Sequence, residues 1–261
     1  MDAFDAQVAM NDSGFAIATM LYGAPQSSDY SLHAALLQGS FDGGAPTWSE
    51  PLRVNNANDN VIAGSQRLAL NAMGQAAIAW TQGSGDSSYA YVNRYEPGEG
   101  LRGWQRMRVG SGSSFAPDVG ADYYGGTFLM VWAEDDPELG HAVYARRYRP
   151  DEWQAPETIV TSTAAMSELC VAVAEDGSAN VVWLQTDGSA QNLLGSRYQV
   201  EQGWDAAAPV EQDDGAAAAP VLGSDFAGRC LVAWERSDGT HTDIWANDYT
   251  PGTGWGSPSF R

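Results

Sequence analysis

A glycine-led phrase returns at regular spacing along the chain, and it constrains the fold more than any other feature. Four clear copies read GQAAIAWTQGSGD, GTFLMVWAEDDPE, GSANVVWLQTDGS and GRCLVAWERSDGT, and a weaker copy reads GFAIATMLYGAPQ. They open at Gly14, Gly74, Gly126, Gly177 and Gly228, with spacings of 60, 52, 51 and 51 residues. A period of this length is typical of folds in which each repeat is one supersecondary unit.

Three further columns keep the same period. Six residues after each glycine stand Met20, Trp80, Trp132, Trp183 and Trp234. A second aromatic column contains Trp48, Trp104, Trp153, Trp204 and Trp255. Between them lie Arg94-Tyr95, Arg147-Tyr148 and Arg197-Tyr198, with Asp248-Tyr249 in the last copy. Several columns in one register predict a common architecture for all the units.

Each unit divides into four short strands. In the fourth unit ELCVAVA alternates, EDG supplies a tight turn, and SANVVWL is apolar on both faces at its centre. LLGSRY follows a polar loop, and a closing strand begins at the second Trp, often as W-x-x-P. Proline fits an outermost strand, where a missing N–H faces solvent. The pattern predicts an all-β fold, a five-bladed β-propeller built from five four-stranded repeats of about 51 residues.

The predicted propeller is a single domain over residues 1–261. Its approximate blades are 1–54, 55–109, 110–160, 161–210 and 211–261. Small residues of the first strand suit the crowded axis, and the Trp of the second strand would fill the gap between neighbouring blades. Ring closure would depend on blade packing without a strand exchanged between the termini. An excised part of a longer array, or a shifted blade frame, therefore stays open.

The consensus G-x-x-x-V-x-W, polar loop, A-R-R-Y-x-P-G-x-G-W-x-x-P resembles tandem-repeat β-propellers of bacterial secreted and surface proteins. In blade number only, the chain also resembles five-bladed propellers of the lectin type. The Asp-box signature S-x-D-x-G-x-T-W is absent. The resemblance implies the fold and a secreted or cell-surface location, and it implies no catalytic residue. The N-terminal MDAFDAQVAM lacks the features of a signal peptide.

The charge of the chain narrows the classes of partner. The net charge is −20, and all 13 basic residues are Arg. Such a surface repels phosphate backbones and anionic lipid, so we expect neither nucleic-acid binding nor membrane insertion. The charge favours neutral polar ligands, carbohydrate above all, with cations or a protein surface as further partners.

Motifs for catalysis are sparse. A glycoside-hydrolase-like enzyme would need carboxylates converging on the axis, and the candidates are Asp5, Asp118 and Glu168. They stand at different depths in the repeat, so Asp118 and Glu168 are better explained as solvated strand-end residues. No G-x-S-x-G elbow or H-E-x-x-H motif occurs. The sequence therefore predicts no catalytic residue, and it leans against an enzyme without excluding one.

The polar loops that follow the second strand vary from unit to unit, and they predict a ligand surface. Short donor and acceptor side chains beside a flat ring can bind sugar hydroxyls. The candidate ligand-binding residues are Asp136, Asp187, Asp238, Gln185, Tyr89, His141 and His241. Asp-Gly sequences also form turns whatever is bound. The main prediction is a non-enzymatic, lectin-like binding module, and the alternatives are the hydrolase-like enzyme and a structural or protein-interaction scaffold.

Three smaller points complete the sequence analysis. Cys170 and Cys230 are better explained as buried thiols than as a disulfide. Arg94, Arg147 and Arg197 are expected to pair with acids on neighbouring blades rather than to bind anions. No cofactor or metal site is expected; the oxygen-rich segments 55–60 and 211–215 leave Ca²⁺ open, although neither has EF-hand spacing.

Overall fold

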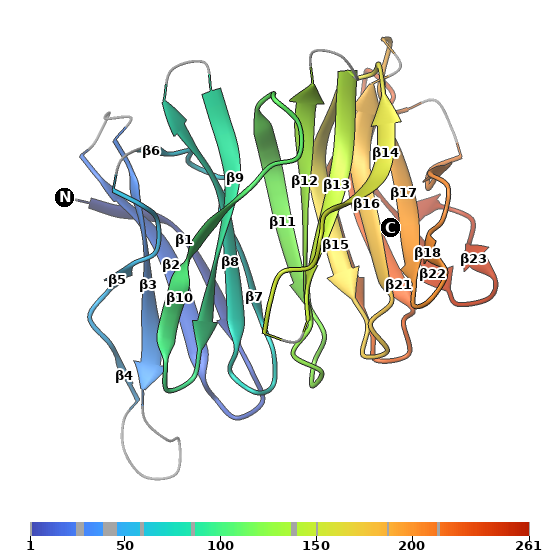
Figure 1. Ribbon diagram of the computed structural model, residues 1–261. Helices are drawn as coiled ribbons and strands as arrows, with labels where there is room; N and C mark the ends of the chain where they lie inside the picture. The colour runs from blue at the N-terminus through green and yellow to red at the C-terminus, as the bar shows by residue number, and fades with distance from the viewer. Residues whose placement is uncertain are drawn as a thin grey trace.

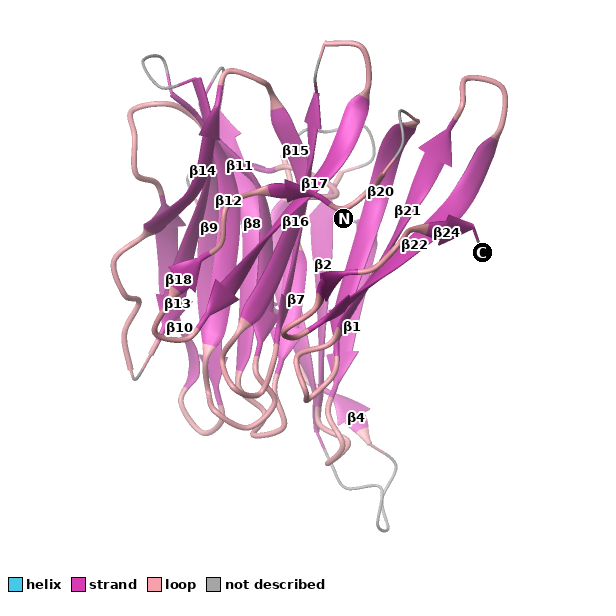
Figure 2. Ribbon diagram, turned by 90° about the vertical axis from the view of Figure 1, so that its right-hand side faces the viewer, coloured by secondary structure: helices cyan, strands magenta, loops and turns pink. Residues whose placement is uncertain are grey.

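A computed structural model describes residues 2–24, 29–38, 46–57, 60–84, 87–136, 140–149, 151–186, 188–212 and 215–260. These residues form five antiparallel sheets that follow one another along the chain (Figure 1). No helix occurs in the described ranges, and therefore none that could cross a bilayer (Figure 2). The predicted five-bladed, all-β propeller is confirmed.

Each sheet is one blade, with its innermost strand first or nearly first in sequence. Blade 1 contains β1 (Asp2–Met10), β2 (Ala16–Gly23), β3 (Ser31–Gln38), β4 (Thr47–Trp48) and β5 (Leu52–Arg53). Blade 2 contains β6 (Asn60–Val61), β7 (Arg67–Leu70), β8 (Ala76–Ser84), β9 (Ser87–Glu96) and β10 (Gly100–Met107). Blade 3 contains β11 (Ser114–Ala121), β12 (Phe128–Asp136), β13 (Gly140–Tyr148) and β14 (Glu157–Ser162).

The last two blades repeat the plan. Blade 4 contains β15 (Met166–Val173), β16 (Ala179–Thr186), β17 (Gln191–Gln199), β18 (Gly203–Trp204) and β19 (Ala208–Pro209). Blade 5 contains β20 (Ala216–Ser224), β21 (Cys230–Ser237), β22 (Thr242–Thr250), β23 (Gly254–Trp255) and β24 (Ser259–Phe260). The inner strands β1, β7, β11, β15 and β20 contact one another in that order.

The recurring glycine opens the second strand because the preceding turn needs a left-handed residue. At Gly74, Gly126 and Gly177 the φ angles are +80°, +70° and +79°, where side chains other than glycine are disfavoured. The outer strand is split in two in blades 1, 4 and 5. Pro51 and Pro258 lie between the two pieces in blades 1 and 5, because proline has no N–H to donate to the ladder.

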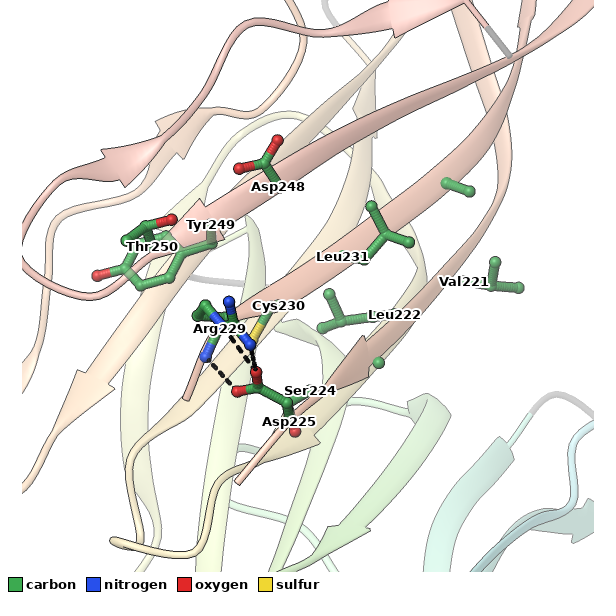
Figure 3. A pocket seen from close by; sticks show the side chains of 12 residues that line it. Val221, Leu222, Ser224, Asp225, Arg229, Cys230, Leu231, Asp248, Tyr249 and Thr250 are labelled. Atoms are coloured by element: carbon green, nitrogen blue, oxygen red, sulfur yellow. Dashed lines mark hydrogen bonds and ion pairs between the residues drawn. The ribbon is translucent and has the colours of Figure 1, made fainter. Parts of the chain in front are cut away.

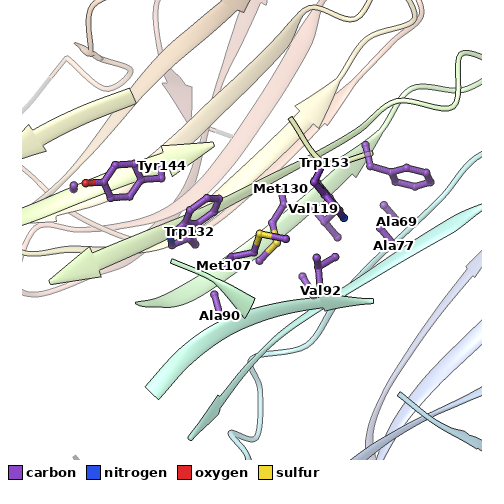
Figure 4. Packing of buried hydrophobic residues seen from close by; sticks show 13 residues of the cluster. Ala69, Ala77, Ala90, Val92, Met107, Val119, Met130, Trp132, Tyr144 and Trp153 are labelled. Atoms are coloured by element: carbon purple, nitrogen blue, oxygen red, sulfur yellow. The ribbon is translucent and has the colours of Figure 1, made fainter. Parts of the chain in front are cut away.

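The core lies between blades, and the strand-two Trp fills it. Trp132 is 0% exposed and packs on Ala90, Val92 and Met107 of blade 2 (Figure 4). The other strand-two tryptophans pack on the preceding blade in the same way, namely Trp80, Trp183 and Trp234. The prediction that this column fills the gaps between blades is confirmed.

In blades 2, 3 and 4 the indole N–H of this column has an acceptor two residues later. Trp80 Nε1 donates to Gln82 Oε1 at 2.8 Å, and Trp132 Nε1 donates to Glu134 Oε1 at 2.9 Å. Glu134 is 0% exposed. An unpaired N–H at these positions would cost the desolvation of a buried polar group. The W-x-[QE] pattern is therefore a structural unit.

The Arg-Tyr column also joins blades, although by a different contact from the one expected. The Arg94 guanidinium lies 3.5 Å from the ring centre of Tyr148 in the next blade, and Arg147 lies 4.0 Å from that of Tyr198. The acid partner of each belongs to its own blade: Glu96 for Arg94 and Glu157 for Arg147. The structural role was predicted, but the partner on the neighbouring blade is an aromatic ring and not an acid.

Removing one inter-blade Trp tests this account of the core. Trp132→Ala should lower the free energy of unfolding by about 3–5 kcal/mol, since it leaves a cavity between two blades. Trp104→Ala is the matched control, because Trp104 is 46% exposed on the outer strand, and it should cost less than about 1 kcal/mol. Urea denaturation followed by circular dichroism measures both. Equal losses for the two variants would contradict the account.

Candidate functional site

The inner strands share a bulge that turns one residue out of the ladder. Pairing with the second strand shifts between Phe4 and Gln7, and the same shift occurs in blades 3, 4 and 5. The residue at the bulge has a positive φ in each case, namely Asp5, Ala116, Glu168 and Ala219. Such bulges re-aim side chains and are common beside functional sites. Asp5 and Glu168 thus occupy equivalent positions, and Asp118 follows two residues after its own bulge.

Each candidate carboxylate accepts a backbone N–H of the next blade. Asp5 Oδ2 accepts the Gly64 N–H at 2.6 Å, Asp118 Oδ2 accepts the Val171 N–H at 2.8 Å, and Glu168 Oε2 accepts the Ala219 N–H at 2.9 Å. Three carboxylates from three inner strands are therefore held along the axis. Relative to the bulge, Asp118 stands two residues further along its strand than Asp5 and Glu168 do, which agrees with the different depths expected from the repeat.

Asp118 is the most perturbed acid of the set. Its side chain is 16% exposed, and Arg67 Nε lies 3.9 Å from its Oδ1. Burial raises the pKa of Asp118 to about 6, against the lowering effects of the Val171 N–H and of Arg67. The expectation that Asp118 is a solvated strand-end residue is wrong, since it lies inside β11. Glu168 is exposed, but it too lies within a strand.

Cys170 connects Asp118 with Glu168. Burial, together with the charges of Asp118 and Glu168, raises the pKa of the Cys170 thiol to about 12. Cys170 Sγ donates to the Pro220 carbonyl at 3.0 Å, and both cysteines are free thiols. We call Asp5, Arg67, Asp118, Glu168 and Cys170 the axial cluster. Its members come from four consecutive blades.

A cavity of about 400 Å³ lies along the inner strands beyond this cluster. Its walls include Val171, whose N–H binds Asp118, together with Val173 and Leu70. Tyr123 and Phe226 line it where the strands turn, with their ring centres 5.0 Å apart. A concave, partly apolar space next to a carboxyl group of raised pKa has the features of an active site.

The residues expected to bind a ligand gather near the far end of the second strands. Asp238 and His241 lie in the loop after β21, whereas Gln185, Tyr89 and His141 lie within β16, β9 and β13. Asp238 accepts the Thr240 and His241 backbone N–H groups, both at 2.8 Å, so it organises its own turn. The hydroxyl of Thr240 holds the pKa of Asp238 below its usual range. Asp136 ends β12 and is half-buried, while Asp187 lies outside the described residues.

Three others of that set have structural contacts. Gln185 Oε1 accepts the indole N–H of Trp183 at 3.3 Å, as Gln82 does in blade 2. Tyr89 lies between Arg106 and Arg108, at 4.9 and 5.3 Å from its ring centre. His141 Nδ1 lies 2.5 Å from Asp135 Oδ1. Whether these loops bind a ligand stays a prediction.

Acidic and imidazole side chains do not gather into a metal site in the described ranges. The segments 55–60 and 211–215, which left Ca²⁺ open, include residues 58–59 and 213–214, outside those ranges. The role of calcium is therefore still a prediction.

Comparison with known proteins finds the fold among enzymes that cleave polysaccharides. No family model matches the chain, and no curated protein matches it in sequence. The α-L-arabinofuranosidase Arb93A of Fusarium graminearum has a TM-score of 0.59 and 15% identity over 98% of this chain and 80% of its own. An endo-arabinase of Bacteroides thetaiotaomicron has a TM-score of 0.52 and 10% identity, covering 92% of both chains. An ulvan lyase of family PL25 has a TM-score of 0.63 and 9% identity, over 98% of this chain and 68% of its own.

These neighbours overturn the prediction of a non-enzymatic, lectin-like binding module. The structures that share the fold include an arabinofuranosidase, an endo-arabinase and a polysaccharide lyase. The same neighbours disfavour the expectation that the protein is not an enzyme. The alternative of an enzyme with central carboxylates agrees better with the fold. Sequence reasoning named the three carboxylates but missed Arg67 as a neighbour of Asp118.

The raised pKa of Asp118 predicts a pH-dependent stability. Because the folded pKa of about 6 lies above the ordinary value of 3.8, the folded state binds more protons, and this carboxyl group lowers stability as pH rises through that window. Asp118→Asn should therefore raise the free energy of unfolding by about 2–3 kcal/mol at pH 7, and the gain should vanish near pH 3.5. Urea titrations at both pH values measure it.

Asp243→Asn supplies the control, because Asp243 is an exposed carboxylate on β22. Its replacement should change stability equally at both pH values. A gain for Asp118→Asn that is independent of pH would show that Asp118 does not titrate in this window.

Proposed function

We propose that the protein is a glycoside hydrolase that acts on a neutral polysaccharide at the axial cluster. The observation that carries the proposal is Asp118, a carboxyl group with a pKa of about 6 on an inner strand of the propeller, near Arg67 and one blade before Glu168. Two carboxyl groups in contrasting environments are what acid–base cleavage of a glycosidic bond requires. The resemblance to arabinan-cleaving enzymes supports the same reaction class.

The roles follow from the two environments. Asp118, which keeps its proton to higher pH, donates it to the leaving glycosidic oxygen. Glu168 is exposed, and its Oε2 accepts the Ala219 N–H. It serves as the base or nucleophile. Asp5, at the equivalent position in blade 1, is a third carboxylate that orients the substrate.

The charge of the chain selects the substrate class. At a net charge of −20, the protein repels a polysaccharide that carries uronic acid, such as the GlcA-containing ligand of the lyase. A neutral arabinan-type chain carries no such penalty. We extend the proposal to a secreted or surface location, which the repeat resemblance supports and which would place the enzyme beside its substrate.

Hydrolysis of linear arabinan, arabino-oligosaccharides and aryl α-L-arabinofuranosides, with products resolved by mass spectrometry, tests this function. Asp118→Asn and Glu168→Gln should each lower kcat by about 10²–10⁴-fold, while Asp243→Asn leaves it unchanged. The rate should fall as pH rises through about 6, because Asp118 loses the proton it donates.

Two results would contradict the proposal. Activity that survives both axial substitutions would move the reaction away from the axis. If the protein turned over no neutral glycan, the proposal that it is a glycoside hydrolase would be wrong.

A further inference from the structure

The forward face of blade 5, which points away from blade 4, is uncovered. Leu231 on β21 stands three residues after its repeat glycine and is 54% exposed. Leu129 stands at the same place in blade 3 and is 2% exposed, because blade 4 covers it. Val221 on β20 is 63% exposed. A position that is core in an internal blade is therefore surface in blade 5.

The backward face of blade 1 is uncovered in the same way. Val8 and Met10 on β1 are 67% and 65% exposed. Their counterparts on β15, Val171 and Val173, are 7% and 8% exposed, since they pack against blade 3. The pairings Val8–Ala18 and Val171–Val181 fix this equivalence. The two uncovered faces are the two halves of the junction that every other pair of neighbouring blades forms.

The space between these faces is a wedge that narrows towards the axis. The Tyr123 hydroxyl donates to Asp12 in the first turn of blade 1, and the Tyr123 ring contacts Phe226 in the first turn of blade 5. One side chain thus contacts both ends of the array at the axis. Further out, β20, β21 and β22 line an open space of about 720 Å³, with Leu231, Val221 and Asp248 along them (Figure 3).

We propose that this wedge seats a further four-stranded blade of the same repeat, with a strand-two aromatic side chain packed on Leu231. Every described junction is made in that way, by Trp80, Trp132, Trp183 or Trp234 packing on the preceding blade. The face of blade 5 that would receive the added blade differs from the other junctions at Asp248. Asp248 is exposed, whereas Arg147, at the equivalent position in blade 3, stacks on the next blade. The added blade therefore presents a basic or hydrogen-bonding group to Asp248, and not the tyrosine of the other junctions.

A second copy of the five-bladed chain fits the wedge less well. Each copy carries a net charge of −20, so two copies repel each other at moderate salt. The space beside blade 5 is a narrowing wedge. A single β-sheet fits into such a space more readily than the surface of a whole globular protein does. The proposal concerns the assembly of the ring and is independent of the proposed hydrolase activity.

Thiol labelling of Leu231→Cys, in a Cys170→Ala, Cys230→Ala background, tests the proposal. In residues 1–261 the new thiol should react with a maleimide as fast as a Thr240→Cys control, which sits in an exposed loop. Fusing a second copy of residues 161–210 after residue 261 preserves the repeat period and supplies Trp183. It should slow labelling of Leu231→Cys at least tenfold and leave Thr240→Cys unchanged.

A second fusion, with residues 110–160, guards against a failure of the first to fold, which circular dichroism detects. Replacing the appended copy of Trp183 by Asp should abolish the protection. Three outcomes overturn the proposal: no protection by either fusion; protection in residues 1–261 that grows with concentration, which means docking of a second copy; and protection in a monomer of residues 1–261 by native mass spectrometry, which means that the five blades close by themselves.

Discussion

Packing of a large aromatic side chain between neighbouring sheets is the interaction on which this fold depends. Each blade has an apolar face on both sides, and neither can be covered within its own sheet. The strand-two Trp covers the face of the preceding blade, and in blades 2, 3 and 4 a Gln or Glu two residues later accepts its indole N–H. The Arg–Tyr stacks add a second contact across the same junctions. Because each junction needs a partner blade, the array has no natural stopping point, and its two ends remain uncovered.

The same geometry creates the chemistry at the axis. Inner strands that contact one another bring side chains from successive blades together, and the bulge turns Asp5 and Glu168 out of the ladder. Asp118 then lies where a carboxylate is poorly solvated, so its proton is held more tightly. The hydrogen bonds from these acids to the next blade hold them in place. The contacts between inner strands therefore both hold neighbouring blades together and produce the raised pKa of Asp118.

The repeat made the blade plan readable from the sequence, because glycine turns and inter-blade Trp residues leave a strict period. The site was less readable. Asp118 and Glu168 do stand at different depths, because Glu168 is the bulge residue of its strand and Asp118 follows its own bulge by two residues. The spacing does not reveal that both side chains nevertheless reach the next blade. Gln185 is predicted to be part of a ligand surface, and the structure adds a contact that W-x-[QE] encodes, in which its Oε1 accepts the indole N–H of Trp183. The proximity of Arg67 to Asp118 depends on contacts between different blades, which a single sequence does not encode locally.

The central claim is that the axis holds a carboxylic acid that keeps its proton near neutral pH. ¹³C NMR titration of the aspartate side-chain carboxyl signals measures this directly, with the Asp118 signal assigned by its loss in Asp118→Asn. The account predicts one signal that titrates near pH 6. A signal for Asp118 that titrates near pH 4, as for an ordinary solvated aspartate, would contradict it.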